Sequence, residues 1–353
     1  MKPRIAVIGT GWWATQFHIP ALVEHEDSDL VALVDRDQAK LDAATARYEV
    51  PRAYTSLDDL VADGEVDGVL VVLPHAYHHE VAKAALEAGL HVFVEKPMTL
   101  TAADAWDLVR TAEAKDLHLT VGYTFHHTPS AAKVRETIQS GAIGDLLHVS
   151  GLFASMVESY LRGRPEDYRS VFEFPVTGPN EDTYSDPAIA GGGQGHLQVT
   201  HAMGMVLWAT GCRPTEVAAF MEQRDLQVDL VDAIVYRLDN GAIGTMASTG
   251  SVAPGQPTQH EFRYYGTEGL ILQDLVTGEV GIHYNDGRVE QVGPLPDGEA
   301  YPAHLPSQRF AELVAGRGEN LAPGDSAAHV VEFLEAAYRS AESDGMPVRT
   351  DEL

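Results

Sequence analysis

The stretch RIAVIGTGWWA (residues 4–14) determines the fold that the sequence predicts. An apolar run ends at Gly9, and apolar residues at helical spacing follow it. Gly-x-Gly-x-x-Ala at such a strand-to-helix turn is typical of dinucleotide-binding domains. The first glycine permits the tight turn, and the second lets a pyrophosphate approach the helix N-terminus. We therefore expect Gly9 and Gly11 to bind a dinucleotide. Trp12 and Trp13 are further candidate cofactor contacts, although packing is the simpler role for both.

The residue that ends the second strand indicates which dinucleotide is bound. Asp35 follows the apolar run at residues 30–34, roughly 20 residues beyond the glycines. An acidic side chain there hydrogen-bonds the adenosine ribose hydroxyls and repels a 2′-phosphate, so NAD is favoured. The neighbouring Arg36 is a candidate for binding that phosphate or stacking on adenine, which leaves NADP possible.

The order of the elements predicts two domains. Up to residue 122, helices alternate with apolar strands at residues 4–9, 30–34, 66–73, 91–94 and 117–122. This alternation predicts an α/β Rossmann domain with a doubly wound parallel sheet over residues 1–122. Residues 123–353 are strand-rich, and the turns DNG (239–241), YGTEG (265–269) and NDG (285–287) predict antiparallel hairpins. The second domain is therefore expected to be α+β, with a large, mostly antiparallel open sheet. Its C-terminal helix, at residues 326–343, is a candidate to pack back on the first domain.

Composition excludes several classes of partner. The chain has 353 residues and a formal net charge of −28, which argues against nucleic acid or an anionic membrane as partner. No apolar run approaches the roughly 18 residues that a membrane span needs. A strand pattern begins at the N-terminus, so we expect no signal peptide. A single cysteine, Cys212, excludes an internal disulfide. We expect a cytoplasmic protein.

A longer stretch carries a family resemblance. VLVVLPHAYHHEVAKAALEAGLHVFVEKP (residues 69–97) resembles the glucose–fructose oxidoreductase / inositol dehydrogenase (Gfo/Idh/MocA) family, whose members carry a Pro-Asn-x-x-His-like turn and then Glu-Lys-Pro. Pro74 and His78 match the turn, and Glu95, Lys96 and Pro97 match the second motif. The resemblance implies a nicotinamide-dependent oxidoreductase acting on a sugar, a sugar derivative or an inositol-like polyol. It also implies cofactor contacts by Pro74, His78, Glu95 and Lys96.

Lys96 is the first candidate catalytic residue. It lies just beyond a parallel strand, at the sheet edge where open α/β sheets bind ligands. Partial burial beside a cationic nicotinamide ring disfavours the ammonium form, so the pKa of Lys96 should fall toward the range of an acid/base.

The second candidate lies in GGGQGHLQVTH (residues 191–201). Family members carry an Asp here and a His four residues later; His201 matches the His, whereas Leu197 stands in place of the Asp. The resemblance therefore implies Lys96 and His201 as the acid/base pair. On an α-helix, Gln194 and Gln198 share a face with His201, so we expect them to bind substrate hydroxyls. The glycines are expected to let the helix start approach the substrate closely.

Further substrate contacts are expected where the sequence becomes irregular. Tyr123 and His126 follow the last strand of the first domain, and Tyr160, Arg162 and Tyr184 lie in a segment typical of a substrate-covering loop. His75 and His79 are four residues apart but lack a third ligand, so we expect no metal site.

Two other functions remain open. GHLQVTHAMG (residues 195–204) faintly resembles a stretch of NAD-dependent glycoside hydrolases, which implies a redox-neutral hydrolase or lyase acting through transient C3 oxidation. A cofactor-binding regulator without turnover is the third possibility. In each case the open sheet should bury its uncovered apolar face against another subunit, which predicts a homodimer or homotetramer.

Overall fold

The computed structural model describes residues 2–353, and their contacts divide the chain into two compact units. The first unit comprises the residues up to 122 together with 163–183 and 303–327; the second comprises 123–162, 184–302 and 328–353. The sequence pattern assigns 163–183 and 303–327 to the second domain. Both segments instead supply side chains to the core of the first unit, Val176 from one and Phe310 from the other.

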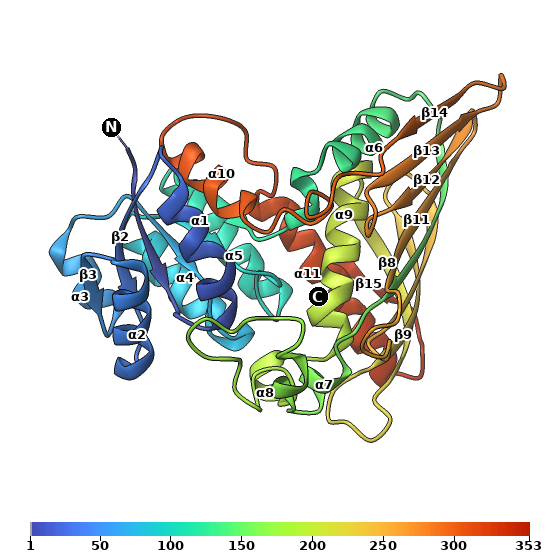
Figure 1. The fold of residues 1–353 in the computed structure, drawn as a ribbon. Helices are drawn as coiled ribbons and strands as arrows, with labels where there is room; N and C mark the ends of the chain where they lie inside the picture. Colours follow the sequence, from blue (N-terminus) through green and yellow to red (C-terminus); the bar gives the residue numbers. More distant parts are fainter. Residues whose placement is uncertain (1) are drawn as a thin grey trace. The chain divides into compact units, whose positions relative to one another are not determined.

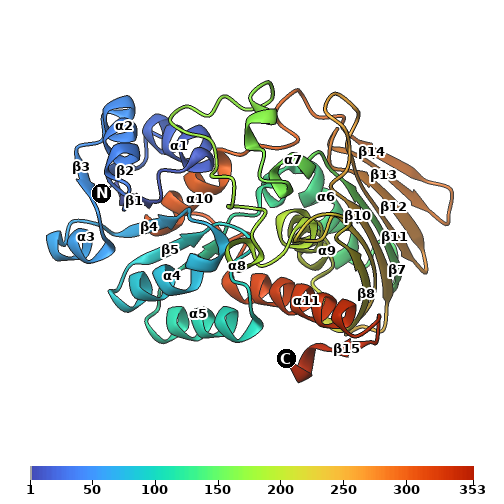
Figure 2. The same cartoon turned by 90° about the horizontal axis from the view of Figure 1, so that it is seen from below.

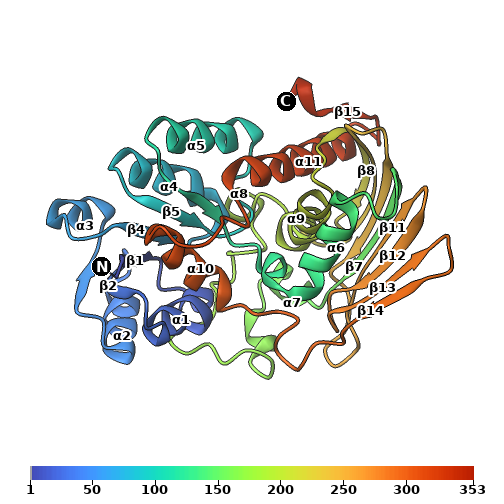
Figure 3. The ribbon, with the colours of Figure 1, turned by 90° about the horizontal axis from the view of Figure 1, so that it is seen from above.

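The first unit is built on a parallel sheet whose strand order is β3-β2-β1-β4-β5-β6. The strands are β1 (Arg4–Ile8), β2 (Asp29–Val34), β3 (Arg52–Tyr54), β4 (Gly68–Val71), β5 (His91–Val94) and β6 (Leu119–Val121). Helices α1 (Ile19–Glu24) and α2 (Gln38–Tyr48) lie on one face, and α4 (His78–Glu87) and α5 (Ala102–Ala114) on the other (Figures 2 and 3). The strand order reverses between β1 and β4, the point at which doubly wound sheets bind ligands. The sequence pattern did not predict β3 and α3 (Leu57–Asp63).

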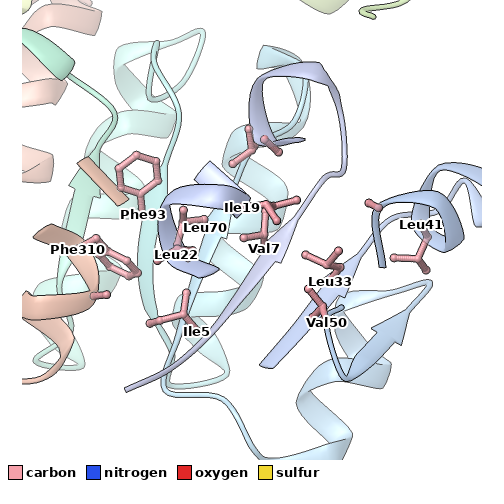
Figure 4. Packing of buried hydrophobic residues seen from close by; sticks show 14 residues of the cluster. Ile5, Val7, Ile19, Leu22, Leu33, Leu41, Val50, Leu70, Phe93 and Phe310 are labelled. Carbon is pink, nitrogen blue, oxygen red and sulfur yellow. The ribbon is translucent and has the colours of Figure 1, made fainter. Parts of the chain in front are cut away.

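The core of this unit explains why its strands are continuously apolar. Ile5, Leu33 and Leu70 are fully buried because helices cover both faces of the sheet (Figure 4). Phe310, from α10 (Leu305–Val314), lies 5.9 Å from the Phe93 ring, measured between centroids. Residues 303–327 therefore complete the hydrophobic core of the first unit.

The second unit is built on a sheet that, within residues 2–353, has nine strands in the order β14-β13-β12-β11-β7-β10-β9-β8-β15 (Figure 1). The strands are β7 (Leu146–Ala154), β8 (Pro214–Glu222), β9 (Val231–Leu238), β10 (Ile243–Thr249), β11 (Gln259–Gly266), β12 (Gly269–Asp274), β13 (Glu279–Tyr284), β14 (Val289–Val292) and β15 (Val348–Arg349). Strands β7 and β10 pair in parallel, whereas the three hairpins predicted from their turns are antiparallel. The predicted fold class is confirmed.

Helix α11 (Gly324–Glu342) covers one face of this sheet. Phe333 lies 5.4 Å from the Tyr236 ring of β9, between centroids, and the Ser340 hydroxyl accepts a hydrogen bond from the Ala219 amide of β8. The first residues of the helix belong to the first unit, where a Cβ at Gly324 would lie 2.5 Å from the Leu119 side chain. No helix within residues 2–353 is both long and apolar enough to cross a membrane.

Candidate active site

The two glycines of the first turn are required for different reasons. Gly9 has φ +98°, and a Cβ there would lie 2.1 Å from the Val72 carbonyl oxygen, so only glycine fits. At Gly11, a Cβ would meet no atom within 4 Å. Packing within the protein therefore does not require a glycine at position 11. The open space suits the close approach of a dinucleotide pyrophosphate, so these residues fit NAD.

Asp35 is held at the edge of the same turn. Its Oδ2 accepts hydrogen bonds from the backbone amide and the hydroxyl of Thr10, both at 2.8 Å, and its Oδ1 accepts from the Asp37 amide at 2.9 Å. The Arg36 guanidinium lies over the Tyr77 ring, 5.3 Å from its centroid. These bonds hold the half-exposed Asp35 carboxylate in place, and its contact with a ribose remains a prediction.

Both tryptophans of the turn contact other parts of the first unit. The Trp12 ring, 8% exposed, makes edge contacts with Phe172 and Phe174, whose centroids lie 5.1 and 5.6 Å away. The Trp13 indole donates a hydrogen bond of 3.1 Å to Glu95 Oε1. Packing therefore accounts for Trp12, and a bond to a carboxylate accounts for Trp13.

Glu95 and Lys96 follow β5. The buried Glu95 carboxylate accepts hydrogen bonds from the Lys96 amide at 3.1 Å and from His18 Nε2 at 2.8 Å. Burial raises the pKa of Glu95. The hydrogen bond from His18, with the nearby Lys96 charge and amide, outweighs burial, so the pKa of Glu95 is lowered overall. Burial also lowers the pKa of Lys96, against the attraction of Glu95. A lowered lysine pKa is what an acid/base at this position requires.

His78 does not face outward to bind a cofactor. Its side chain is fully buried, and its ring nitrogens Nδ1 and Nε2 each lie 2.8 Å from a carbonyl oxygen, those of Pro97 and Leu73. Burial lowers the pKa of His78, and the two carbonyl contacts oppose this. The ring thus links the start of α4 to the Lys96–Pro97 peptide, which is cis. This corrects the predicted cofactor contact of His78, whereas Pro74 remains a half-buried candidate.

The glycines of residues 191–195 approach protein rather than substrate. A Cβ at Gly193 would lie 2.0 Å from the Asp229 carbonyl oxygen, and one at Gly195 would lie 2.5 Å from the Tyr338 hydroxyl. The Asp229 carboxylate accepts hydrogen bonds from both glycine amides at 2.7 Å and from the Tyr338 hydroxyl at 2.8 Å. The sequence predicted that these glycines approach the substrate closely. In the structure they lie close to Asp229 and Tyr338 of the same unit.

Gln194 is also internal. Its side chain is fully buried, and its amide nitrogen donates to the Ser248 hydroxyl at 2.8 Å. Its amide oxygen accepts from the Ser155 hydroxyl at 3.2 Å. The predicted substrate contact of Gln194 is thus corrected to a structural role.

The prediction that Gln194 and Gln198 share a face with His201 assumed a regular α-helix, but the chain forms a π-helical turn here. Residues Gly195–Val199 form this turn, and α9 (Thr200–Thr210) continues from it. The His201 ring lies edge-on to Phe125 and Tyr301, with centroids 6.0 and 6.3 Å away, and Gln198 is half-buried. His196 stacks on Tyr338, and burial lowers the pKa of His196 to about 4. Turns of this kind are frequent at functional sites.

Tyr123 and His126 pack inside the second unit. The Tyr123 hydroxyl lies 3.3 Å from the Thr200 hydroxyl. The His126 ring stacks on Trp208 with centroids 4.7 Å apart, and its Nε2 lies 3.1 Å from the Gly204 carbonyl oxygen. Both side chains are buried and make these internal contacts, and their predicted substrate contacts remain predictions.

The irregular segment contributes an ion pair and a pair of aromatic rings. The Arg162 guanidinium binds both carboxylate oxygens of Asp225, at 2.8 and 2.9 Å, and Glu158 at 2.7 Å. These bonds raise the pKa of Arg162 and occupy three of its five N–H donors, and its predicted substrate contact remains a prediction. Tyr160 is buried against the half-buried Tyr184, with ring centroids 5.5 Å apart.

His79, one of the two histidines considered as metal ligands, contacts a carboxylate of the same unit. His79 Nε2 lies 2.8 Å from Asp107 Oδ2, which also accepts from Lys83 at 2.7 Å. Across the described residues 2–353, no group of three or more His, Cys, Asp and Glu side chains is arranged to hold a metal.

Three residues at the site were missed or underrated by sequence reasoning. His18 lies 77 positions from Glu95, and Asp229 lies 36 positions from Gly193 and 109 from Tyr338. QFHIPAL (residues 16–22) gave a weak signal for His18. No local pattern marks Asp229 or Tyr338, because their partners are brought together only by folding.

Comparison with known proteins identifies the family. The Gfo/Idh/MocA family of oxidoreductases with an NAD-binding Rossmann fold matches residues 3–123, and the C-terminal domain of the same family matches residues 131–272. The chain belongs to the Gfo/Idh/MocA family. The first unit of this family member is therefore an NAD-binding Rossmann domain, as predicted.

Its relatives are oxidoreductases with varied substrates. It is 29% identical over 278 residues to dTDP-3,4-didehydro-2,6-dideoxy-alpha-D-glucose 3-reductase of Saccharopolyspora spinosa, covering 77% of this chain and 75% of the relative. It is 25% identical over 353 residues to D-xylose 1-dehydrogenase (NADP(+)) 2 of Haloferax volcanii, covering 98% and 99%. The structure of GenD2 from gentamicin A biosynthesis, in complex with NAD, is 27% identical, with a TM-score of 0.79 over 99% of this chain and 96% of that one. With several other relatives the match spans less than half of their length.

Proposed function

We propose that the protein is an NAD-dependent dehydrogenase that oxidises a hydroxyl carbon of a sugar, a sugar derivative or an inositol-like polyol. The observation that carries the proposal is the half-buried Lys96, which lies just beyond β5 in the NAD-binding Rossmann domain and whose pKa is lowered by burial. NAD, when bound, supplies the acceptor for the hydride. Gly9, Gly11 and Asp35 would hold it.

In the proposed reaction, the proton of the substrate hydroxyl passes to Lys96 Nζ while the C–H bonding pair leaves the carbon as hydride. The carbonyl of the product forms as the O–H and C–H bonds break. A lysine that is neutral before the reaction can accept the proton, and the lowered pKa of Lys96 favours that form. The resulting ammonium is stabilised by the Glu95 carboxylate.

We propose His201 as the second member of the acid/base pair, with its imidazole hydrogen-bonding the same hydroxyl oxygen. Its ring is 5% exposed and bordered by Phe125 and Tyr301, which suits a histidine with a defined orientation. The half-buried Gln198 and Tyr184 remain candidate contacts for other hydroxyls of the substrate.

The names of the relatives support a carbohydrate or polyol as substrate. They include a deoxysugar nucleotide reductase, a xylose dehydrogenase and an inositol 2-dehydrogenase of Corynebacterium glutamicum. Each of these three names refers to a sugar, a sugar derivative or a cyclic polyol. An enzyme for such a substrate needs several hydrogen-bonding side chains besides its acid/base pair.

The test is reduction of NAD+ and NADP+ at 340 nm across monosaccharides, glycosides and inositols. We expect Lys96→Ala and His201→Ala to lower kcat by about 100-fold or more, the usual contribution of a general acid/base. Lys83→Ala, which removes a lysine paired with Asp107, is the matched control and should retain activity. If both site variants keep full activity, the assignment is wrong. Product release without net NADH would favour the redox-neutral alternative.

We also propose that the second unit forms a homodimer or homotetramer through its sheet. In the single chain, Phe220 is 69% exposed and Val235 54%, and Ile243 and Leu272 are also exposed. Apolar side chains of this size on one sheet face favour burial against another subunit.

A further inference from the structure

The proposed reaction does not use His18, although this histidine contacts the residue next to Lys96. The His18 ring is 1% exposed, and its Nε2 lies 2.8 Å from Glu95 Oε1. Because a carboxylate can only accept, His18 Nε2 carries the hydrogen of this bond. Within residues 2–353, His18 Nδ1 has no hydrogen-bond partner, and the edge of the ring faces Phe93 at 5.3 Å between centroids. The single polar contact of this buried side chain is thus with Glu95.

Glu95 is held on several sides. Trp13 Nε1 donates to the same oxygen as His18, and the Lys96 amide donates to the other oxygen. A Cβ at Gly122, just beyond β6, would lie 2.6 Å from Glu95 Oε1, so a larger residue there would crowd the carboxylate. Such packing fixes the carboxylate in one place next to the backbone of Lys96.

We propose that His18 is a positioning residue for the reaction: its hydrogen bond keeps the Glu95 carboxylate ionised and aligned to stabilise the ammonium form of Lys96. This inference rests on the proposed role of Lys96 as acid/base. His18 lies at the end of the π-helical turn Ala14–His18, which directly follows the dinucleotide turn. The same helix start would therefore contact the cofactor at Gly11 and position Glu95, next to the proposed acid/base Lys96, through His18.

The physical reason is the cost of burying a carboxylate. Without a strong donor, a buried carboxyl group takes up a proton, because the low-dielectric surroundings disfavour its charge. The hydrogen bond from His18 to Glu95, at 2.8 Å, is shorter than the 3.1 Å bond from Trp13, and it opposes that effect. When Lys96 accepts the hydroxyl proton, the new positive charge forms beside an anion already in place.

The experiment measures the proton affinity of Lys96 directly, without turnover. Competitive labelling with acetic anhydride, followed by peptide mass spectrometry, gives the pH at which Lys96 becomes reactive in the full-length protein, with and without NAD+. His18→Leu removes the donor, and His18→Gln places an amide N–H near the position of Nε2. His25→Leu, a histidine that follows α1 and lies near Glu312, is the control.

Loss of the Glu95 charge should lower the pKa of Lys96, since that carboxylate attracts its ammonium form. We expect His18→Leu to move the labelling midpoint to lower pH by about one unit, with His18→Gln closer to the wild type and His25→Leu unchanged. In the assay, kcat should fall more than KM changes, and the pH limb of kcat should move in the same direction. If His18→Leu does not fold, His18→Asn, whose amide is too short to reach the carboxylate, replaces it.

The two proposals fail in different ways. Labelling curves of His18→Leu or His18→Asn that overlay the wild-type curve would overturn the role of His18, whatever the activity. A shifted curve together with a fully active Lys96→Ala variant would support the His18–Glu95–Lys96 coupling and refute Lys96 as the acid/base.

Discussion

Replacing Asp229 with Asn tests whether this carboxylate holds the glycine-rich turn that leads to His201. Asp229 Oδ1 accepts from the Gly193 amide and the Tyr338 hydroxyl, and Oδ2 accepts from the Gly195 amide. An asparagine can place its oxygen at only one of these two positions. If it keeps the two bonds at Oδ1, its NH2 group faces the Gly195 N–H, and one buried backbone donor is left without an acceptor.

The number of hydrogen bonds lost or weakened gives the expected decrease in the free energy of unfolding. A buried donor without a partner costs about 1–3 kcal/mol, and the two remaining bonds lose part of their strength with the charge of the acceptor. We therefore expect Asp229→Asn to lower the free energy of unfolding by about 2–4 kcal/mol. Asp232→Asn is the matched control: burial, and then the charge of Asp229, raises the pKa of Asp232 well above its usual range. A neutral acid is there replaced by a neutral amide of similar size, so the control should cost less than Asp229→Asn at neutral pH.

Two measurements check the prediction. Urea unfolding of both variants gives the change in stability, and hydrogen–deuterium exchange of the peptide covering residues 190–200 reports the turn itself. We expect faster exchange of this peptide in Asp229→Asn alone. A loss below about 0.5 kcal/mol, the size of an ordinary surface substitution, or equal losses in the two variants, would refute the reasoning.

The remaining predictions concern Asp232, the two glycines of the dinucleotide turn and Phe220. Folded Asp232 retains a proton that the unfolded chain releases above about pH 4, so the wild type should lose stability as the pH rises above that value. In urea unfolding, the stability of Asp232→Asn relative to the wild type should therefore increase over the same pH range. Parallel stability profiles of the two proteins would contradict this prediction. Gly11→Ala should leave the melting temperature nearly unchanged but weaken NAD binding about tenfold or more in calorimetry, because its Cβ fills space that only a ligand would occupy. Gly9→Ala should instead destabilise the fold, since its Cβ would overlap the Val72 carbonyl oxygen, and equal effects of the two variants would count against the assignment. Phe220→Asp should shift light-scattering masses toward the monomer, whereas an unchanged mass would exclude this sheet face as the interface.

Local patterns were sufficient for much of the fold. The continuous apolar strands of the first unit, its Gly9-x-Gly11 turn and the hairpin turns of the second unit all depend on residues close in sequence. Backbone sterics and burial on two faces act over a few residues, so these patterns are visible without a structure. The short strand β3 (Arg52–Tyr54) was not predicted, because it is only partly apolar and forms through its parallel pairing with β2.

The site shows where such reasoning ends. Sequence alone, through the Glu95-Lys96-Pro97 motif and its place after a parallel strand, selected Lys96 and the nicotinamide cofactor. Only the tertiary structure decided that Gln194 and His78 are internal, that the glycines of residues 191–195 approach Asp229 and Tyr338, and that His18 binds Glu95. Each of these depends on a hydrogen bond between residues far apart in sequence, and a single π-helical turn changes which side chains share a face. The type of residue limits what chemistry is possible, but the partner that uses its donors and acceptors is determined by folding.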